Sequence, residues 1–221
     1  MNIKTILQKT ADFFEKHGLA SPRLDAEVLL ADLLEMERIK LYVNFDYPLK
    51  KKELNEYRER VRRRVKREPV SYITGHKEFM SLDFKIEKGV LIPRPETEEL
   101  VENIIDYCEK NSLSAPNIVE VGPGSGAVMV SLGHYLSEAK IIGIDISEDA
   151  VRVTKKNIVK HDLSNRLNVI RGDVLNPLLK KGKNNVDIVV SNPPYISSEE
   201  MDNLPPEVRK EPAISLEAGE D

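Results

Sequence analysis

Hydrophobic residues at helical spacing predict a helical first part of the chain. An amphipathic pattern over residues 2–16 predicts a helix that is stopped at Gly18. Ser21 and Pro22 then suit the start of a second helix, with Ser as N-cap and Pro at the first helical position. A third helix is predicted from about Lys51 to Lys66, with few apolar residues.

From Phe79 the pattern changes to short extended segments. Residues 79–86 are close to alternating, and Val90 to Ile92 follow Gly89, which predicts a β-hairpin or a pair of short strands. Pro95 and the acidic residues after it favour the start of a helix that runs to about Lys110.

After Pro116, strands and helices alternate. Short apolar runs predict strands, and longer mixed segments predict helices. The expected strands are 117–121, 140–144, 167–171 and 186–191, and the expected helices between them are 127–136 and 150–161. This order predicts an α/β domain with a mainly parallel sheet and helices on its faces.

Composition narrows the classes of function. Lys+Arg 33 against Asp+Glu 37 gives a formal charge of -4, so a globally basic nucleic-acid-binding protein is not expected. The single cysteine, Cys108, fits a reducing cytosol, and we expect a cytoplasmic monomer. No stretch has the length of a membrane span, and four scattered histidines predict no metal site. The arginines around Arg58 to Arg67 favour a solvated helix face over a docking patch, because glutamates dilute their charge.

A glycine-rich loop lies between a predicted strand and a predicted helix. Gly122, Pro123, Gly124, Ser125 and Gly126 differ in spacing from the Gly-x-Gly-x-x-Gly of dinucleotide-binding folds, so pyrophosphate is not the required ligand. The acidic Glu120 just before the loop would repel a phosphate but favour a cation. S-adenosylmethionine (SAM) carries both a sulfonium and an ammonium, and is the expected cofactor.

Acidic residues also end the next two strands. Asp145 can accept hydrogen bonds from both ribose hydroxyls, while its alternative role is the N-cap of the next helix, for which Ser147 competes. Asp173 and Val174 could contact an adenine, on its amino group and on its face, or form an ordinary turn. All these residues belong to the carboxyl edge of a parallel sheet, where ligands bind.

The last predicted strand is followed by Asn192, Pro193, Pro194 and Tyr195. The Asn192 side-chain oxygen and the Pro193 carbonyl can accept hydrogen bonds from a planar NH2 group, and two prolines fix the backbone between them. The ring of Tyr195 offers a flat stacking face. We therefore predict catalytic roles for Asn192, Pro193 and Tyr195 and substrate binding by all four residues. Alone, the tetrapeptide is also compatible with a turn.

Together these motifs resemble the HemK/PrmC family, protein-glutamine methyltransferases that act on peptide chain release factors. The resemblance covers nearly the whole chain and rests on residues 21–27, 68–75, 78–79, 91–98, the glycine loop, 192–196 and 211–213. It implies a helical substrate-docking domain over residues 1–75, a β-hairpin linker over 76–93 and a Rossmann-like SAM-binding methyltransferase domain over 94–221.

The resemblance further implies methylation of the glutamine side-chain amide in a Gly-Gly-Gln motif. Residues 122–126 and Asp145 would bind SAM, Asn192 both SAM and substrate, and Pro193 and Tyr195 the substrate. Attack of the amide nitrogen would be direct, without an enzyme nucleophile. Glu120 replaces the more usual Asp, and Pro123 the more usual Thr. Because the family's SAM domain continues further, we expect a fragment whose sheet has an unpaired edge.

Two alternatives stay open from the sequence. One is a methyltransferase for another planar NH2, either a ribosomal-protein glutamine or a DNA adenine, although a DNA enzyme should have a basic cleft and flip its base. The other is a non-catalytic SAM-binding module. Whether the chain binds S-adenosylhomocysteine (SAH) is a simple measurement with which to examine the second alternative.

Overall fold

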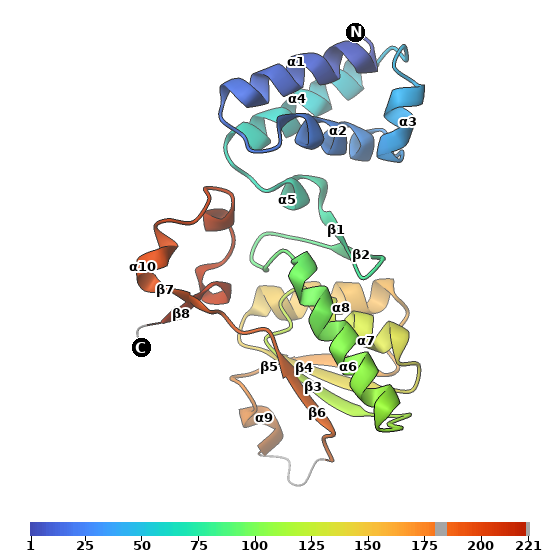
Figure 1. The fold of residues 1–221 in the computed structure, drawn as a ribbon, viewed down its shortest axis with the longest axis vertical. Coiled ribbons are helices and arrows are strands. Elements are labelled where there is room, and N and C mark those ends of the chain that lie inside the picture. The colour runs from blue at the N-terminus through green and yellow to red at the C-terminus, as the bar shows by residue number, and fades with distance from the viewer. Residues whose placement is uncertain (180–184, 220–221) are drawn as a thin grey trace. The chain divides into compact units, whose positions relative to one another are not determined.

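A computed structural model of the chain describes residues 1–179 and 185–219. The chain forms two compact units (Figure 1). Unit 1 comprises Met1–Gly75 together with Pro206–Lys210, and unit 2 comprises His76–Pro205 together with Glu211–Asp221.

Unit 1 is helical. The predicted helices are present as α1 (Ile3–Lys16), α2 (Pro22–Leu33) and α4 (Lys51–Val65), and two short helices that the sequence pattern did not predict, α3 (Arg38–Val43) and α5 (Val70–Thr74), accompany them. Their apolar faces meet in one core, in which Leu7, Phe14, Leu29, Leu41 and Tyr57 are fully buried. The Tyr57 hydroxyl donates to the Ala26 carbonyl at 2.9 Å and so satisfies its polar tip inside that core.

The arginines of α4 mostly serve the fold of unit 1. Arg64 is buried, so the interpretation as a solvated face is wrong at this position, whereas Arg58 and Arg62 are exposed and agree with it. Its guanidinium donates to Asp25 at 2.7 Å and to Glu207 at 3.0 Å, and Arg67 also contacts Glu207 at 3.2 Å. A buried guanidinium needs such carboxylates, because an unpaired charge in the interior is strongly destabilising.

Unit 2 begins with a hairpin of β1 (His76–Phe79) and β2 (Leu82–Lys85). The hairpin is shorter than the predicted extended region, and Val90 to Ile92 do not form a strand. The reason is local, because Met80 and Ser81 both have positive φ, 50° and 57°, and provide the tight turn that joins antiparallel strands. The helix expected after Pro95 is present as η1 (Pro95–Thr97) and α6 (Glu98–Lys110).

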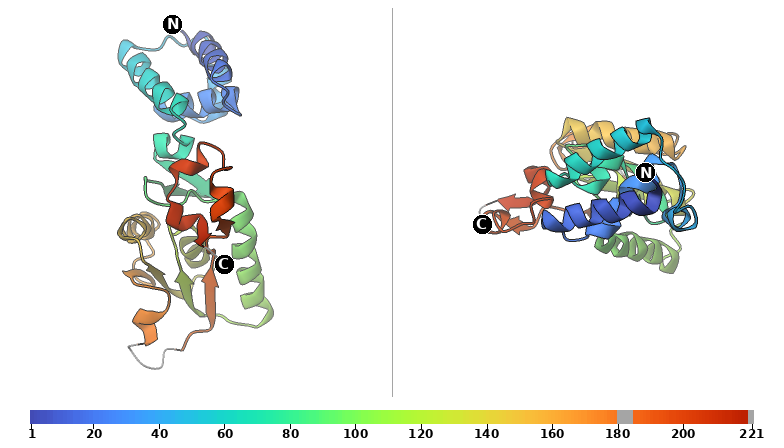
Figure 2. Two further views of the ribbon diagram at one scale, coloured as in Figure 1. Left: turned by 90° about the vertical axis from the view of Figure 1, so that its left-hand side faces the viewer. Right: turned by 90° about the horizontal axis from the view of Figure 1, so that it is seen from above.

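The predicted parallel sheet is confirmed. It contains β3 (Asn117–Val121), β4 (Lys140–Asp145), β5 (Leu167–Arg171) and β6 (Ile188–Ser191) in the order β5-β4-β3-β6. Helices α6, α7 (Ala127–Tyr135) and α8 (Glu148–Lys160) flank this sheet (Figures 1 and 2). Within the described ranges β5 and β6 are the two edge strands of this sheet.

The register brings the strand ends together. Val121 lies opposite both Ile144 and Ser191, and Asp145 lies opposite Arg171. The residues that follow the four strands therefore share the carboxyl edge of the sheet.

The remaining elements are short. They are α9 (Asn176–Leu179), β7 (Ile196–Ser197), α10 (Ser198–Met201), η2 (Val208–Lys210), η3 (Ala213–Ser215) and β8 (Glu217–Gly219), with β7 and β8 paired in parallel. None of the helices described has the length and apolar character needed to cross a membrane.

Candidate active site

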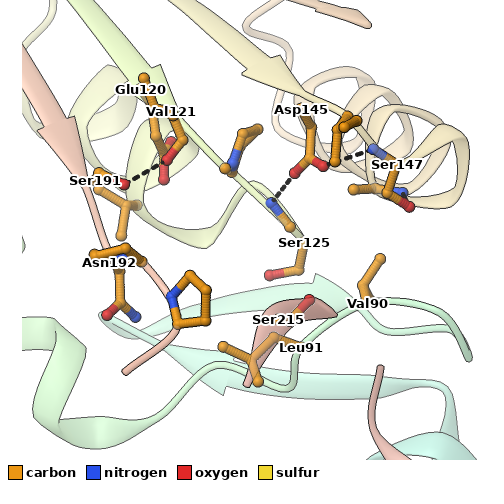
Figure 3. A pocket seen from close by; sticks show the side chains of 18 of the residues that line it. Val90, Leu91, Glu120, Val121, Ser125, Asp145, Ser147, Ser191, Asn192 and Ser215 are labelled. Carbon is orange, nitrogen blue, oxygen red and sulfur yellow. Dashed lines mark hydrogen bonds between the residues drawn. The ribbon is translucent and has the colours of Figure 1, made fainter. Parts of the chain in front are cut away.

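A cavity of about 320 Å³ opens at the carboxyl edge of the sheet (Figure 3). Its wall is made by residues at the end of, or just after, each strand of the sheet, and residues of the segments 89–97 and 214–215 complete it. Of the residues predicted from sequence, the cavity brings together Glu120, Gly122, Pro123, Gly124, Ser125, Asp145, Asp173, Val174, Asn192, Pro193 and Pro194. Gly126 and Tyr195 do not line it.

The glycine loop leaves room for a ligand at two of its three glycines. Gly122, Gly124 and Gly126 have positive φ of 72°, 58° and 80°, which only glycine adopts readily. A Cβ added at Gly122 or Gly124 would meet no protein atom within 4 Å, so the backbone there is open to close approach. At Gly126 a Cβ would lie 2.8 Å from Thr154 Cγ2. Gly126 thus permits close packing of α7 and α8, and does not line the cavity.

Glu120 is a buried acid in the cavity wall, with 2% of its surface exposed. Its Oε2 accepts a hydrogen bond from the Met129 amide at 2.9 Å. Burial raises the pKa of Glu120 to about 8, and the nearby charge of Asp145 adds to the rise, although the Met129 bond opposes it. At neutral pH the carboxyl is therefore mostly protonated, and a cationic ligand beside it would favour ionisation.

Asp145 is held by two backbone donors. Its Oδ2 accepts from the Gly124 amide at 3.0 Å and its Oδ1 from the Ser147 amide at 2.9 Å, and Figure 3 shows both bonds. Ser147 is the N-cap of α8, since its Oγ accepts from the Ala150 amide at 3.3 Å. The competing role for Asp145 as N-cap is therefore wrong. Each carboxylate oxygen keeps capacity for a further donor, such as a ribose hydroxyl.

Asp173 and Val174, in the loop after β5, also line the cavity. Val174 is 56% exposed and has a φ of 46°. This conformation is unusual for a β-branched residue, and such strain is concentrated at ligand sites. Asp173 accepts a hydrogen bond from Asn176 at 3.3 Å, at the start of α9.

The Asn192 side chain has an orienting partner that sequence reasoning missed. Its Nδ2 donates to Thr97 Oγ1 at 3.4 Å, and among the described residues Oδ1 has no donor, so it can serve as an acceptor. Thr97 is 95 positions earlier in the chain, within the 91–98 motif that supported the resemblance but was assigned no role. Arg94 of the same motif also lines the cavity.

The structure separates the Tyr195 ring from the first cavity. Tyr195 is 78% exposed and lines a second cavity of about 280 Å³ instead. The second cavity shares part of its wall with the first, including Asn192 and Pro193. The two cavities are therefore neighbours at Asn192 and Pro193.

Both parts of the chain match described protein families. Residues 5–75 match the PrmC N-terminal domain, and residues 112–210 match a methyltransferase domain. The fold is thus the Rossmann-like fold of methyltransferases, preceded by a PrmC-type helical domain.

Curated relatives match over almost the whole chain. A release factor glutamine methyltransferase from Rhodopirellula baltica is 40% identical over 99% of this chain and 74% of the relative. Another from Clostridium acetobutylicum is 39% identical over 100% of this chain and 77% of the relative. The chain therefore spans about three-quarters of these relatives.

Solved structures are more distant. The catalytic domain of human METTL16, in complex with the MAT2A 3'UTR hairpin 6, is 18% identical, with a TM-score of 0.49 over 77% of this chain and 58% of that one.

Proposed function

The chain belongs to the family of release factor glutamine methyltransferases, and we propose that it transfers the SAM methyl group to the side-chain amide nitrogen of the glutamine in a release factor's Gly-Gly-Gln motif. The observation that carries this proposal is that Asn192 and Pro193 line the same cavity as the glycine loop and Asp145. An acceptor pair for a planar amide thus adjoins a site suited to a nucleoside with a cationic tail.

The residues of the first cavity fit SAM. Gly122 and Gly124 offer open backbone, Asp145 has acceptor capacity for the ribose, and Val174 exposes an apolar face for the adenine. Glu120 provides the acid for a cationic tail. SAM, when bound, supplies an electrophilic methyl group.

The chain's own residues then hold the amide for attack. Asn192 Oδ1 and the Pro193 carbonyl would accept hydrogen bonds from the two amide protons and so orient the nitrogen for attack. Positioning of this kind can contribute about 7 kcal/mol or more to lowering the barrier. The exposed ring of Tyr195, which belongs to the second cavity, would stack on a peptide group next to the glutamine. The proton leaves the nitrogen after transfer, so no dedicated base is needed.

To test this, the chain is incubated with methyl-labelled SAM and with a mixture of a release factor, ribosomal proteins and DNA. We expect label on the glutamine of Gly-Gly-Gln, located by peptide mass analysis. Label only on a ribosomal protein or on DNA would overturn the proposed substrate but would still support methyltransferase activity. SAH binding without label on any acceptor would favour a non-catalytic SAM-binding module.

Cofactor binding is expected to release a proton from Glu120. Below pH 8 the carboxyl is mostly neutral, and the ligand's ammonium group favours its ionised form. At pH 7 we expect release of up to about one proton, and an SAH affinity that increases by up to about tenfold per pH unit until about pH 8. Calorimetric titration with SAH in two buffers of different ionisation enthalpy measures the proton count.

Glu120→Gln is the matched control for this proton. The variant has no titrating group at this position, so the difference in proton release from the wild type isolates Glu120. The unligated protein has the opposite trend: the stabilisation from protonated Glu120 is complete below pH 4.5 and is lost as pH rises through about 8. Equal proton release by both proteins would refute the role of Glu120.

Replacing Thr97 with valine is expected to lower kcat about tenfold, with little change in SAH affinity. Valine has the same shape but no acceptor for Asn192 Nδ2, so the carboxamide loses its fixed orientation. Single-turnover methylation of a release factor measures the effect. Thr97→Ser keeps the hydroxyl and should restore most of the rate, and a serine variant as slow as the valine variant would contradict this role.

A further inference from the structure

The second cavity borders the proposed reaction point. It is lined on one side by Leu91, Arg94, Glu96, Thr97 and Leu100, and on the other by Asn192, Pro193, Tyr195, Ile196, Ser215 and Leu216. The residues that it shares with the first cavity are Leu91, Arg94, Thr97, Asn192, Pro193 and Ser215. A segment lying in the second cavity would therefore present a side chain to the first one.

Among the described residues that line the second cavity, Arg94 is the only cation, and an ion pair with Glu211 holds it in place. Arg94 Nη2 donates to Glu211 Oε1, and Glu211 Oε2 accepts from the Ile92 amide at 2.9 Å. The Glu211 side chain is 2% exposed, whereas that of Arg94 is 33% exposed. The buried carboxylate thus holds a guanidinium whose side chain is partly exposed, and Arg94 lines both cavities.

The chemistry of the wall favours a neutral, hydrogen-bonding segment. Leu91, Leu100, Ile196 and Leu216 give it an apolar surface. Glu211 neutralises the charge of Arg94, and Glu96 adds a further acid, so an anion such as a nucleic-acid phosphate meets no net positive charge. Arg94 nevertheless has N–H groups beyond the one donated to Glu211. Peptide carbonyl oxygens are neutral acceptors that suit such donors.

We propose that Arg94 donates hydrogen bonds to main-chain carbonyls of the substrate next to the target glutamine, and that Glu211 is the positioning residue that holds Arg94 there. The proposal rests on the proposed function and adds a determinant of peptide recognition to it. Arg94 acts on substrate binding and Asn192 on the reacting amide, so their variants should affect different kinetic constants.

The test measures methylation of a release factor and of a synthetic peptide containing Gly-Gly-Gln by the wild type, Arg94→Gln and Glu211→Gln. We expect Arg94→Gln to raise KM for both substrates about 10- to 150-fold, the range for a lost hydrogen bond to a charged group. Its kcat and its SAH Kd should stay close to those of the wild type. Glu211→Gln should raise KM in the same direction by a smaller factor.

The double variant separates positioning from a merely structural role. If Glu211 acts through Arg94, the double variant should have the KM of Arg94→Gln alone, since coupled residues are not additive. Additive effects would overturn the role of Glu211. Arg152→Gln, in an exposed ion pair on α8, is the matched control and should leave KM unchanged. Arg94→Lys keeps the positive charge but lacks the planar guanidinium with its several N–H donors, so its KM should be intermediate. This variant also tests the proposal if Arg94→Gln does not fold.

The outcomes distinguish a failure of the role proposed for Arg94 from a failure of the proposed methyltransferase function. If the wild type does not label the release factor, the proposed function fails, whatever the variants do. If the wild type labels it and Arg94→Gln has an unchanged KM, only the role of Arg94 fails. A variant with weaker SAH binding and an unchanged KM would place Arg94 in cofactor binding and overturn the proposal as well.

Discussion

Replacing Asn192 with alanine is expected to lower kcat for release factor methylation about 100-fold or more. The variant loses the side-chain acceptor and the contact with Thr97, so the amide nitrogen is no longer held in line with the methyl group. A displacement of about 1 Å is enough for a loss of this size. Single-turnover labelling with saturating SAM measures the methyl transfer step directly.

SAH affinity of the same variant serves as the internal control. Most of the proposed cofactor contacts come from the glycine loop and Asp145, so SAH binding should change far less than kcat. Asn203→Ala, at an exposed asparagine of unit 2, is the matched substitution and should retain full activity. An Asn192→Ala enzyme with half the wild-type rate would refute the role assigned to Asn192.

The second large effect is expected from Asp145→Asn, on cofactor binding. Both carboxylate oxygens now face backbone donors, at Gly124 and Ser147. An asparagine must turn its NH2 group toward one of those amides, which leaves that donor without a partner and removes one acceptor from the ribose. The loss of a charged hydrogen bond costs about 1.5–3 kcal/mol, so SAH affinity should fall roughly 10- to 150-fold.

Calorimetric titration with SAH measures this loss, and thermal unfolding of both proteins detects any accompanying loss of stability. Asp149→Asn is the matched control, because Asp149 is an exposed acid in the first turn of the neighbouring helix α8. An unchanged SAH affinity in Asp145→Asn would remove the ribose from the proposed contacts of this residue.

The sequence predicted the sheet and its loops well because their signals are local. Buried parallel strands need continuous apolar runs, and the loops that follow them need glycine or short polar residues, so both can be recognised within a few residues. The hairpin was predicted at the wrong residues because its turn is made by Met80 and Ser81. Neither residue is typical of such a turn, and Gly89 gave the stronger signal.

Contacts between distant segments were not predictable from spacing. The bond between Thr97 and Asn192 and the pair of Arg94 with Glu211 depend on the path of the chain between them. For Tyr195, closeness in the sequence was misleading. Because Tyr195 follows the two prolines, we predicted that its ring lies in the same site as Asn192. In the structure Tyr195 is 78% exposed and lines the second cavity only.

The discontinuity of unit 1 bears on how members of this family can be recombined. Pro206–Lys210 packs with the N-terminal helices, and Glu207 supplies a carboxylate to both Arg64 and Arg67. A chimera that exchanges only the first 75 residues would set one parent's arginines against the other parent's acid. The N-terminal helices and this five-residue segment lie far apart in the sequence but form one unit, so a functional graft should carry both.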